Sequence, residues 1–257
     1  MIPSVFIAHG APLLAIEDNG YTRFLTDLGK LYHPRAVILF SAHWISGTQK
    51  VSNVEHYETI HDFGGFPEEL YQIQYPASGD AILAKEVELL LTAEGISYQV
   101  DSKRGLDHGA WVVLRLLYPN ADVPVISMSV NPRLTPKEQY QIGRSLRSLR
   151  EKEVLIIASG GTVHNLGALQ WGSHQVDPWA QEFDQWLEGR LFTWDLNSLF
   201  QYKDIAPHVE LAVPLLGNEH FIPLFYAMGA ADEVKKATLL HRSYQYGSLS
   251  HSVWQFG

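Results

Sequence analysis

Four short, almost wholly apolar runs constrain the fold of this 257-residue chain more than any other feature. They lie at residues 2–8, 36–42, 123–129 and 154–159, and most of them are rich in β-branched side chains. Runs of this length and composition favour strands over helices. Strands without polar alternation are typical of a sheet that is covered on both faces. We therefore expect a central sheet buried between layers of helices.

Amphipathic stretches with recognisable ends separate these runs. Asp80 can begin a helix that stops at Gly95, and residues 135–138 (Thr-Pro-Lys-Glu) form a capping box with proline at the first helical position. Asp107 and Asp177 can start two more helices. The alternation of strands and helices predicts an α/β fold.

The whole chain, residues 1–257, is predicted to form a single domain, because no linker, repeat or low-complexity tract interrupts it. Residues 237–254 can add antiparallel edge strands to the sheet. No apolar segment approaches the length of a membrane span, and residues 1–8 do not resemble a signal peptide. The expected location is therefore the cytoplasm.

Composition narrows the classes of function. The formal net charge is −9, from 28 acidic and 19 basic residues, so we expect no nucleic-acid partner. The chain has no cysteine, which excludes disulfides, thiolate metal sites and cysteine nucleophiles. It has 12 histidines. Any transition metal must therefore be held by imidazole and carboxylate groups.

Three of the apolar runs lead to a histidine at or just past their carboxyl ends. These residues are His9, His43 and His164. In open α/β sheets ligands bind at the carboxyl edge, so the three imidazoles converge if the strands are parallel. A single histidine after a strand is more often a solvated loop residue or a hydrogen-bonded core residue. The repetition on equivalent strand ends makes a metal site an equally good interpretation.

Other histidines have more ambiguous settings. His108 lies at a predicted helix start, where the helix dipole favours a neutral ring, although it can also be a plain exposed residue. Either Glu219 or His220 can face a metal. His61 lies in an aromatic loop with Gly and Pro, which suits a lid or substrate wall as well as a surface turn. No role is expected for His33, His56, His174, His208, His241 and His251.

The chain resembles the class III extradiol ring-cleaving dioxygenases, in particular their 4,5-DOPA dioxygenase branch. The matching segments occur in order over nearly the whole chain, which makes the set specific although each piece alone is weak. They are residues 9–12 (HGAP), 41–44 (SAHW), 60–67 (IHDFGGFP), 106–111 (LDHGAW), 158–166 (ASGGTVHNL), 218–221 (NEHF) and 246–250 (YGSLS).

The resemblance implies a mixed sheet flanked by helices, which together with the parallel strands expected above gives a mixed, mostly parallel sheet. It also implies one mononuclear divalent metal bound by His9, His43 and His220. His164 belongs to the same cluster, as a fourth ligand or as an acid/base group, and His108 is a second catalytic histidine. Fe(II) is implied for activity, and Zn(II) is possible in the isolated protein.

The implied reaction is cleavage of a catechol beside its diol, with both atoms of dioxygen incorporated and a DOPA-like or caffeate-like substrate. His61 and its loop are expected to contact that substrate. Many non-haem Fe(II) oxygenases use two histidines and one carboxylate, whereas the third position here is His220, with Glu219 as the competitor. A zinc hydrolase and a non-catalytic binding protein on the same fold remain alternatives, and the oligomeric state is open.

Overall fold

The computed structural model describes residues 1–173, 175–215 and 217–257, so the expectation for His174 lies outside the described residues. Within them, eight strands form one sheet in the order β4-β3-β5-β2-β6-β1-β8-β7. The strands are β1 (Ser4–Ala8), β2 (Ala36–Ile45), β3 (Gln49–Ser52), β4 (Tyr98–Asp101), β5 (Val125–Val130), β6 (Val154–Gly160), β7 (Ala237–Gln245) and β8 (Leu249–Phe256).

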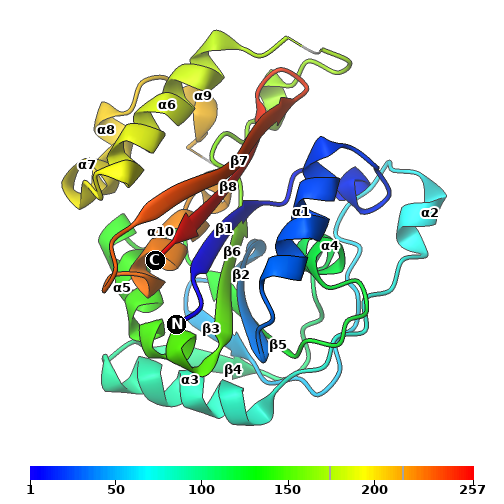
Figure 1. Ribbon diagram of the computed structural model, residues 1–257, viewed down its shortest axis with the longest axis vertical. Coiled ribbons are helices and arrows are strands. Elements are labelled where there is room, and N and C mark those ends of the chain that lie inside the picture. Colours follow the sequence, from blue (N-terminus) through cyan, green and yellow to red (C-terminus); the bar gives the residue numbers. More distant parts are fainter. Residues whose placement is uncertain (174, 216) are drawn as a thin grey trace.

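The sheet is mixed and mostly parallel. At its centre β5, β2, β6 and β1 run parallel to one another. On one side β3 pairs antiparallel with β5 and parallel with β4, and on the other β8 pairs antiparallel with both β1 and β7. The predicted α/β fold class is confirmed. Because β1, β2 and β6 are parallel, their carboxyl ends lie together at one edge (Figure 1).

Helices cover both faces of this sheet. They are α1 (Gly20–Leu31), α2 (Glu68–Tyr71), α3 (Ala81–Ala93), α4 (His108–Leu117), α5 (Pro136–Ser145), α6 (Pro178–Phe192), α7 (Leu196–Phe200), α8 (Tyr202–Ile205), α9 (Val209–Ala212) and α10 (Pro223–Ala230). Short 3₁₀ helices are η1 (Pro12–Ala15), η2 (Arg147–Lys152), η3 (Leu166–Ala168) and η4 (Asn218–His220). Figure 1 shows α1 and α4 on one side of the central strands and α5 and α10 on the other.

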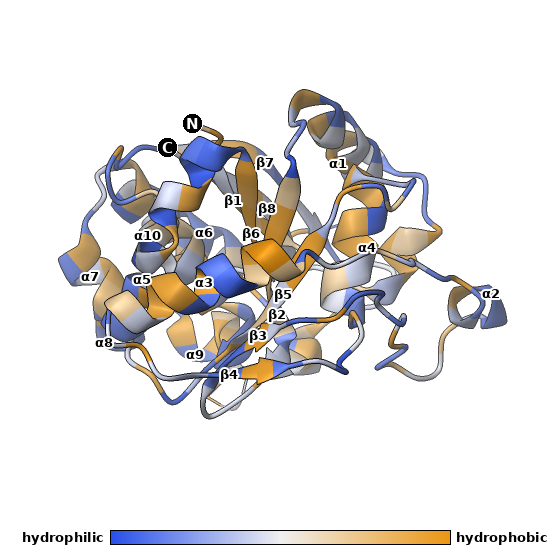
Figure 2. Ribbon diagram, turned by 90° about the horizontal axis from the view of Figure 1, so that it is seen from below, coloured by the Kyte–Doolittle hydropathy of each residue, from blue (hydrophilic) through white to orange (hydrophobic). Residues whose placement is uncertain are grey.

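The central strands are apolar because both of their faces are buried. On β2, Val37 and Leu39 pack in the core shared with α1 and α4, whereas Ile38 and Phe40 pack in the core shared with α5 and α10. The Phe40 ring lies 4.6 Å from that of Tyr226 on α10. Figure 2 shows the hydrophobic strands enclosed between helices with mixed hydrophilic and hydrophobic surfaces.

The predicted helix starts are found at α3, α4, α5 and α6. Asp80 accepts a hydrogen bond from the Leu83 amide, Asp107 accepts one from Ala110, and Thr135 forms the capping box. Asp177 precedes α6, but its side chain makes no capping hydrogen bond. It accepts one from Gln170 instead.

Some elements differ from the expectations. The strands β3 and β4 were not predicted, because each has only four residues and carries polar side chains such as Gln49 and Asp101. The run at 36–42 continues to Ile45, so His43 lies inside β2 and not after it. The tail is antiparallel as expected, but β8 lies between β1 and β7, so of these two tail strands β7 alone is at an edge of the sheet. None of the helices in the described residues is long and apolar enough to cross a membrane.

Candidate metal centre

Three imidazoles from distant parts of the chain meet at the carboxyl edge of the sheet. His9 follows β1, His43 lies near the end of β2, and His220 ends η4. Nε2 of His43 lies 3.1 Å from Nε2 of His9 and 3.3 Å from Nε2 of His220. One ring nitrogen from each residue lies within 4.8 Å of the other two.

Each of the three rings has a partner for its other nitrogen. The hydroxyl of Ser159 donates its hydrogen to the Gly109 carbonyl, so it accepts from Nδ1 of His9 at 3.1 Å. Nδ1 of His220 donates to the Glu219 carboxylate at 3.2 Å. Nδ1 of His43 lies 3.3 Å from the carboxylate of Asp62. These partners keep the protons on Nδ1 and leave the Nε2 atoms as acceptors.

With the protons on Nδ1, the three Nε2 lone pairs face one another. Such an arrangement is repulsive unless a cation lies among the nitrogens. Imidazole suits Zn, Fe, Cu and Ni, so the donor set fits a divalent transition metal. The residues that would hold it are His9, His43 and His220.

Burial keeps these rings neutral. It lowers the pKa of His9 and His220 well below the usual value, and the neighbouring imidazoles, first among them His43, lower both further. The pKa of His43 falls to about 4, mainly through burial and then through repulsion by His108. Near pH 7 the lone pairs are therefore available to a metal without prior loss of a proton.

Glycines allow the close approach of the elements that carry these histidines. A Cβ on Gly160, at the end of β6, would lie 2.1 Å from the His220 carbonyl oxygen, which accepts a hydrogen bond from the Gly161 amide at 2.8 Å. A Cβ on Gly109 in α4 would lie 2.9 Å from Cδ2 of His43. Larger residues at either position would displace His220 or His43.

His108 lies beside this cluster and is oriented by Asp62. Nδ1 of His108 and its backbone amide both donate to Oδ1 of Asp62, each at 2.9 Å. The ring centroid lies 3.9 Å from that of His43. Burial alone would raise the pKa of Asp62, but the hydrogen bonds and charge of His108 outweigh it and lower this pKa to about 2. A permanent carboxylate thus fixes the His108 ring.

His164 is close to His9 and His220 but outside the group whose nitrogens converge. Its ring stacks on that of His220, with centroids 3.6 Å apart and planes 4° apart. Its amide donates to the Ala212 carbonyl. Burial, followed by repulsion from His220, lowers the pKa of His164 well below the usual value. The ring is therefore a neutral base next to the cluster.

A cavity of about 330 Å³ opens onto these histidines. His43, His108, His164 and His220 line its inner end, with Asp62 beside them. The remaining described lining residues are apolar or aromatic, or come from the turn after His9: Gly10, Ala11, Pro12, Phe63, Phe66, Leu166, Leu169, Trp171, Tyr246 and Leu249. Its size and apolar lining are typical of small-molecule sites.

His61 does not line this cavity. Its Nε2 lies 3.1 Å from the Ile73 carbonyl, and its ring contacts Phe63 and Trp111. The following residues of the same loop, Asp62 and Phe63, do line it.

The sequence interpretation assigned no role to Asp62 or Ser159. Both lie inside segments quoted for the resemblance, residues 60–67 and 158–166, but a carboxylate or hydroxyl gives no local signal of the ring that it contacts. Their roles depend on contacts across 46 residues for the Asp62–His108 pair and 150 for the His9–Ser159 pair.

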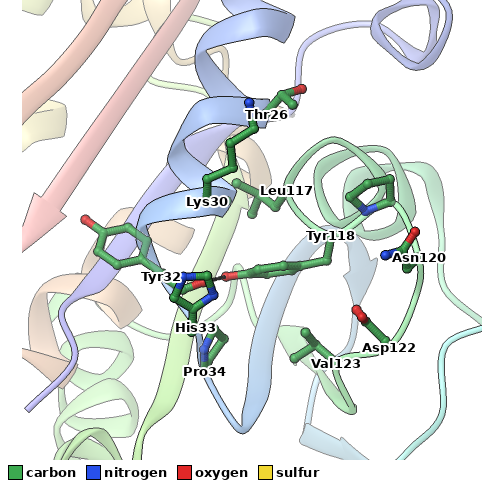
Figure 3. A pocket seen from close by; sticks show the side chains of 12 residues that line it. Thr26, Lys30, Tyr32, His33, Pro34, Leu117, Tyr118, Asn120, Asp122 and Val123 are labelled. Atoms are coloured by element: carbon green, nitrogen blue, oxygen red, sulfur yellow. Dashed lines mark hydrogen bonds between the residues drawn. The ribbon is translucent and has the colours of Figure 1, made fainter.

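A second cavity, of about 420 Å³, lies near the ends of α1 and α4 (Figure 3). Tyr118 donates a hydrogen bond to the Tyr32 carbonyl at its base, and Lys30, His33 and Asp122 line it. Its described lining includes none of the histidines for which a role was predicted. The larger cavity is therefore not the candidate site.

Comparisons with known proteins agree with this geometry. The family model described as the catalytic LigB subunit of aromatic ring-opening dioxygenase matches residues 4–256. The chain is 42% identical over 256 residues to a 4,5-DOPA dioxygenase extradiol from Beta vulgaris, covering 98% of this chain and 95% of the relative. It is 36% identical over 262 residues to a protein of the same name from Escherichia coli K12, and the match covers 100% of this chain and 95% of that relative.

A solved structure has the same fold over its full length. It is that of an uncharacterized protein from Escherichia coli K12, with a TM-score of 0.85 and 32% sequence identity, and the match covers 100% of both chains.

Proposed function

The chain belongs to the LigB family of aromatic ring-opening dioxygenases, and from this premise we propose that it opens a catechol ring at a metal held by His9, His43 and His220. Membership makes it an extradiol dioxygenase, an oxidoreductase that acts on a small molecule and dioxygen. The convergence of three Nε2 atoms is the observation that carries the proposed ligand set.

We propose Fe(II) as the metal of the active enzyme and Zn(II) as a metal that the isolated protein can also hold. When bound, either ion favours the ionised form of a catechol, but only Fe(II) supplies the redox chemistry that dioxygen needs. The protein's part is to hold the reactants, exclude water and move protons.

His164 is proposed as the base that takes a proton from a catechol hydroxyl. It lines the cavity, is neutral near pH 7, and is held in place by its stacking on His220. This stacking supports a proton-transfer role over that of a fourth ligand. General base help of this kind contributes about 10²–10⁴-fold to a rate.

His108 is proposed as the second proton-transfer group. Because Asp62 holds its Nδ1 proton, its Nε2 is the atom free to take up a proton and return it to a reacting oxygen. Asp62 balances the charge of the ring while that proton is held. Phe63 and Phe66 cover this end of the cavity with apolar surface and exclude water.

The proposed substrate is a catechol with a side chain on its ring, and L-DOPA and caffeate are the first compounds to assay. His61 is proposed to act on this substrate indirectly, because its contacts with Ile73 and Phe63 hold the loop that covers the cavity.

We also propose the cytoplasm as the location of the protein, which cell fractionation tests.

Oxygen uptake tests the proposed activity. Protein loaded anaerobically with Fe(II) should consume dioxygen with L-DOPA or caffeate, and labelled dioxygen should place both of its atoms in the ring-opened product. Zn(II)-loaded protein should consume none. If Fe(II) protein takes up no dioxygen across a catechol panel, the dioxygenase assignment is wrong, and a hydrolase or a binding protein is the better reading.

Metal content tests the ligands. His9→Ala and His43→Ala should fold but lose metal by elemental analysis. His56→Ala is the matched control, because the His56 ring is exposed and does not belong to the cluster of converging nitrogens. This variant should keep its metal. Full metal retention in both ligand variants would refute the ligand set.

A further inference from the structure

A second group of metal-binding side chains lies beside the first and shares His43 with it. One ligand atom from each of His43, Asp62 and His108 lies within 4.8 Å of the other two. Nδ1 of His108 lies 2.9 Å from Oδ1 of Asp62, and Nδ1 of His43 lies 3.3 Å from Oδ2. The Nε2 atom of His43 belongs to the first group, so its Nδ1 atom is available to the second.

The spacing of these atoms suits a metal ion. Two ligands of a tetrahedral zinc ion, each about 2.0–2.1 Å from it, lie about 3.3 Å apart. The two nitrogen-to-oxygen distances at Asp62 are close to this value, so an ion needs only small movements of the side chains. Two imidazoles and one carboxylate are also the donor set of many catalytic zinc sites, which keep a fourth position for water.

An ion can reach this group from the cavity, because all three side chains line the cavity wall. The side chains of His43 and Asp62 are 23% and 25% exposed, which leaves an open side for a water ligand. The carboxylate is also held in place from outside the group. The backbone amide of His108 donates to Oδ1 of Asp62 at 2.9 Å, and this hydrogen bond can persist when an ion replaces the ring proton of His108.

The charges of the second group favour a cation, but the first ion opposes it. Asp62 contributes a negative charge, and the nearby guanidinium of Arg104 is balanced by the carboxylate of Asp107 at 3.0 Å. An ion in the first group repels a second one, and the second must also displace the ring protons that face Asp62. We therefore expect the second ion to bind more weakly, so that desalted protein keeps only the first.

Building on the proposed first site, we propose that the chain binds a second divalent ion of the zinc type at Nδ1 of His43, the carboxylate of Asp62 and Nδ1 of His108, and that this ion inhibits the enzyme. With both ions bound, His43 releases its Nδ1 proton to solvent and bridges the ions as an imidazolate. His108 keeps one ring proton, which moves from Nδ1 to Nε2. That nitrogen then cannot take up the proton that the proposed reaction assigns to it.

Calorimetric titration of the metal-free protein with Zn(II) tests the number of sites. We expect two equivalents, the second bound at least about tenfold more weakly than the first. His108→Ala should keep the first equivalent and lose the second, and His43→Ala should lose both. His56→Ala, at an exposed ring outside both groups, is the matched control and should keep two. One equivalent in the parent, or two in His108→Ala, would overturn the proposal.

His108→Phe guards this test against a general loss of structure. It keeps an aromatic ring at a buried position but has no nitrogen to offer an ion. We expect it to match His108→Ala, with the first equivalent intact and the second absent. Two equivalents in His108→Phe would remove His108 from the second site.

Cu(II), which imidazole also binds, reports on the shared ring. Two Cu(II) ions joined by one imidazolate couple magnetically, so the electron paramagnetic resonance signal of the first ion should fall when the second binds. In His108→Ala the signal of the first ion should persist at the same excess of Cu(II). A signal that instead grows in proportion to the bound copper in the parent would contradict the bridge.

Oxygen uptake tests the inhibition. Zn(II) added to the Fe(II) enzyme until the second site is full should lower kcat about 10²–10⁴-fold, because proton transfer by His108 is lost. Elemental analysis of the desalted protein should still find its iron, and a weak chelator should restore turnover. Undiminished turnover, or inhibition only when iron is lost, would contradict the inhibitory role.

The two proposals fail separately. If the Fe(II) protein takes up no dioxygen with any catechol, the proposed dioxygenase activity is wrong, whereas two Zn(II) equivalents that fall to one in His108→Ala still support the second site. If turnover is found but the parent binds a single equivalent, the activity stands and the second site is wrong.

Discussion

At the scale of single residues, one carboxylate connects the two halves of the site. Oδ1 of Asp62 accepts from Nδ1 of His108, and Oδ2 lies 3.3 Å from Nδ1 of His43. The same side chain therefore orients a proposed ligand and a proposed proton-transfer group. A change at Asp62 should therefore affect metal affinity and turnover together.

Asp62→Asn should reduce kcat/KM and metal affinity by about 10–100-fold each, the usual effect of losing a group that orients a ligand. The amide can still accept from His108 through its oxygen, but its NH₂ group then faces the Nδ1 proton of His43. Titration with a competing chelator measures the metal affinity. Asp18→Asn, at an exposed residue in an ion pair with Arg23, is the control and should change neither quantity.

His164→Ala should leave catechol binding to the Zn(II) protein within a fewfold of the parent while kcat falls by about 10²–10⁴-fold. The reason is that the ring supplies a proton acceptor and does not belong to the three converging nitrogens. Binding is measured by calorimetry and turnover by oxygen uptake. A metal content that falls with kcat would instead indicate a fourth ligand, and unchanged turnover would remove the base role.

The sequence alone predicted the histidines at the ends of apolar runs. It did not predict the residues that orient their rings. The places of the strands pointed to His9, His43 and His164, and the resemblance pointed to His220, with Glu219 as the competitor, as the third proposed ligand. In the structure both Glu219 and His220 lie at the site, because the Glu219 carboxylate accepts a hydrogen bond from Nδ1 of His220. Asp62 and Ser159 could not be assigned, since their partners are set by how strands and helices pack.

At the scale of elements, the site depends on how closely α4 approaches β2. Gly109 lies in the first turn of α4, and a Cβ there would lie 2.8 Å from Oγ of Ser41 and 2.9 Å from Cδ2 of His43. Neither contact is tolerable without movement. The first turn of α4 thus carries His108 itself, and the missing side chain of Gly109 leaves room for the His43 ring.

Gly109→Ala should lower metal affinity about tenfold or more, because the methyl group displaces the His43 ring. The control is Gly189→Ala in α6, where a Cβ meets no other described atom within 4 Å. That control should keep its metal affinity and gain roughly 0.5–1 kcal/mol in free energy of unfolding. Chelator competition and urea denaturation measure the two effects. Equal metal affinity in both variants would contradict the packing argument.

Strands and helices marked by an apolar run or a helix cap in the sequence were predicted. Strands whose formation or position depends on the strands beside them were not. Apolar runs and helix-start residues located β1, β2, β5 and β6 and the starts of α3, α4, α5 and α6. The position of β8 inside the sheet had no such signal, because alternation along a strand does not reveal its partners. The polar, half-exposed β4 resembles a loop in sequence and is a strand only because β3 lies beside it.

At the scale of the whole molecule, the buried histidines couple stability to pH. In the unfolded chain histidine takes up a proton near pH 6.5, whereas burial keeps His9, His43, His164 and His220 neutral in the folded chain down to much lower pH. His251, with a pKa of about 3, behaves in the same way. Below pH 6.5 the unfolded state therefore binds more protons than the folded state.

The metal-free protein should lose stability as the pH falls from 6.5 towards 4. Each of these histidines contributes up to about 1.4 kcal/mol per pH unit to that loss, and above pH 6.5 their contribution is constant. Urea denaturation at pH 7.5, 6.5 and 5.5 measures the slope. Stability that is flat or that rises on acidification would show that the rings are protonated in the folded state.

The pairing of β1 with both β6 and β8 has a consequence for biosynthesis. His9 emerges early from the ribosome, but its strand lacks both neighbours until residues 154–160 and then 249–256 have been made. Arg150 reinforces this late closure, since its guanidinium donates to the carbonyls of Ile2, Ala230 and Phe256. Metal loading should accordingly be a late event in maturation, and a nascent chain halted before residue 249 should not retain iron.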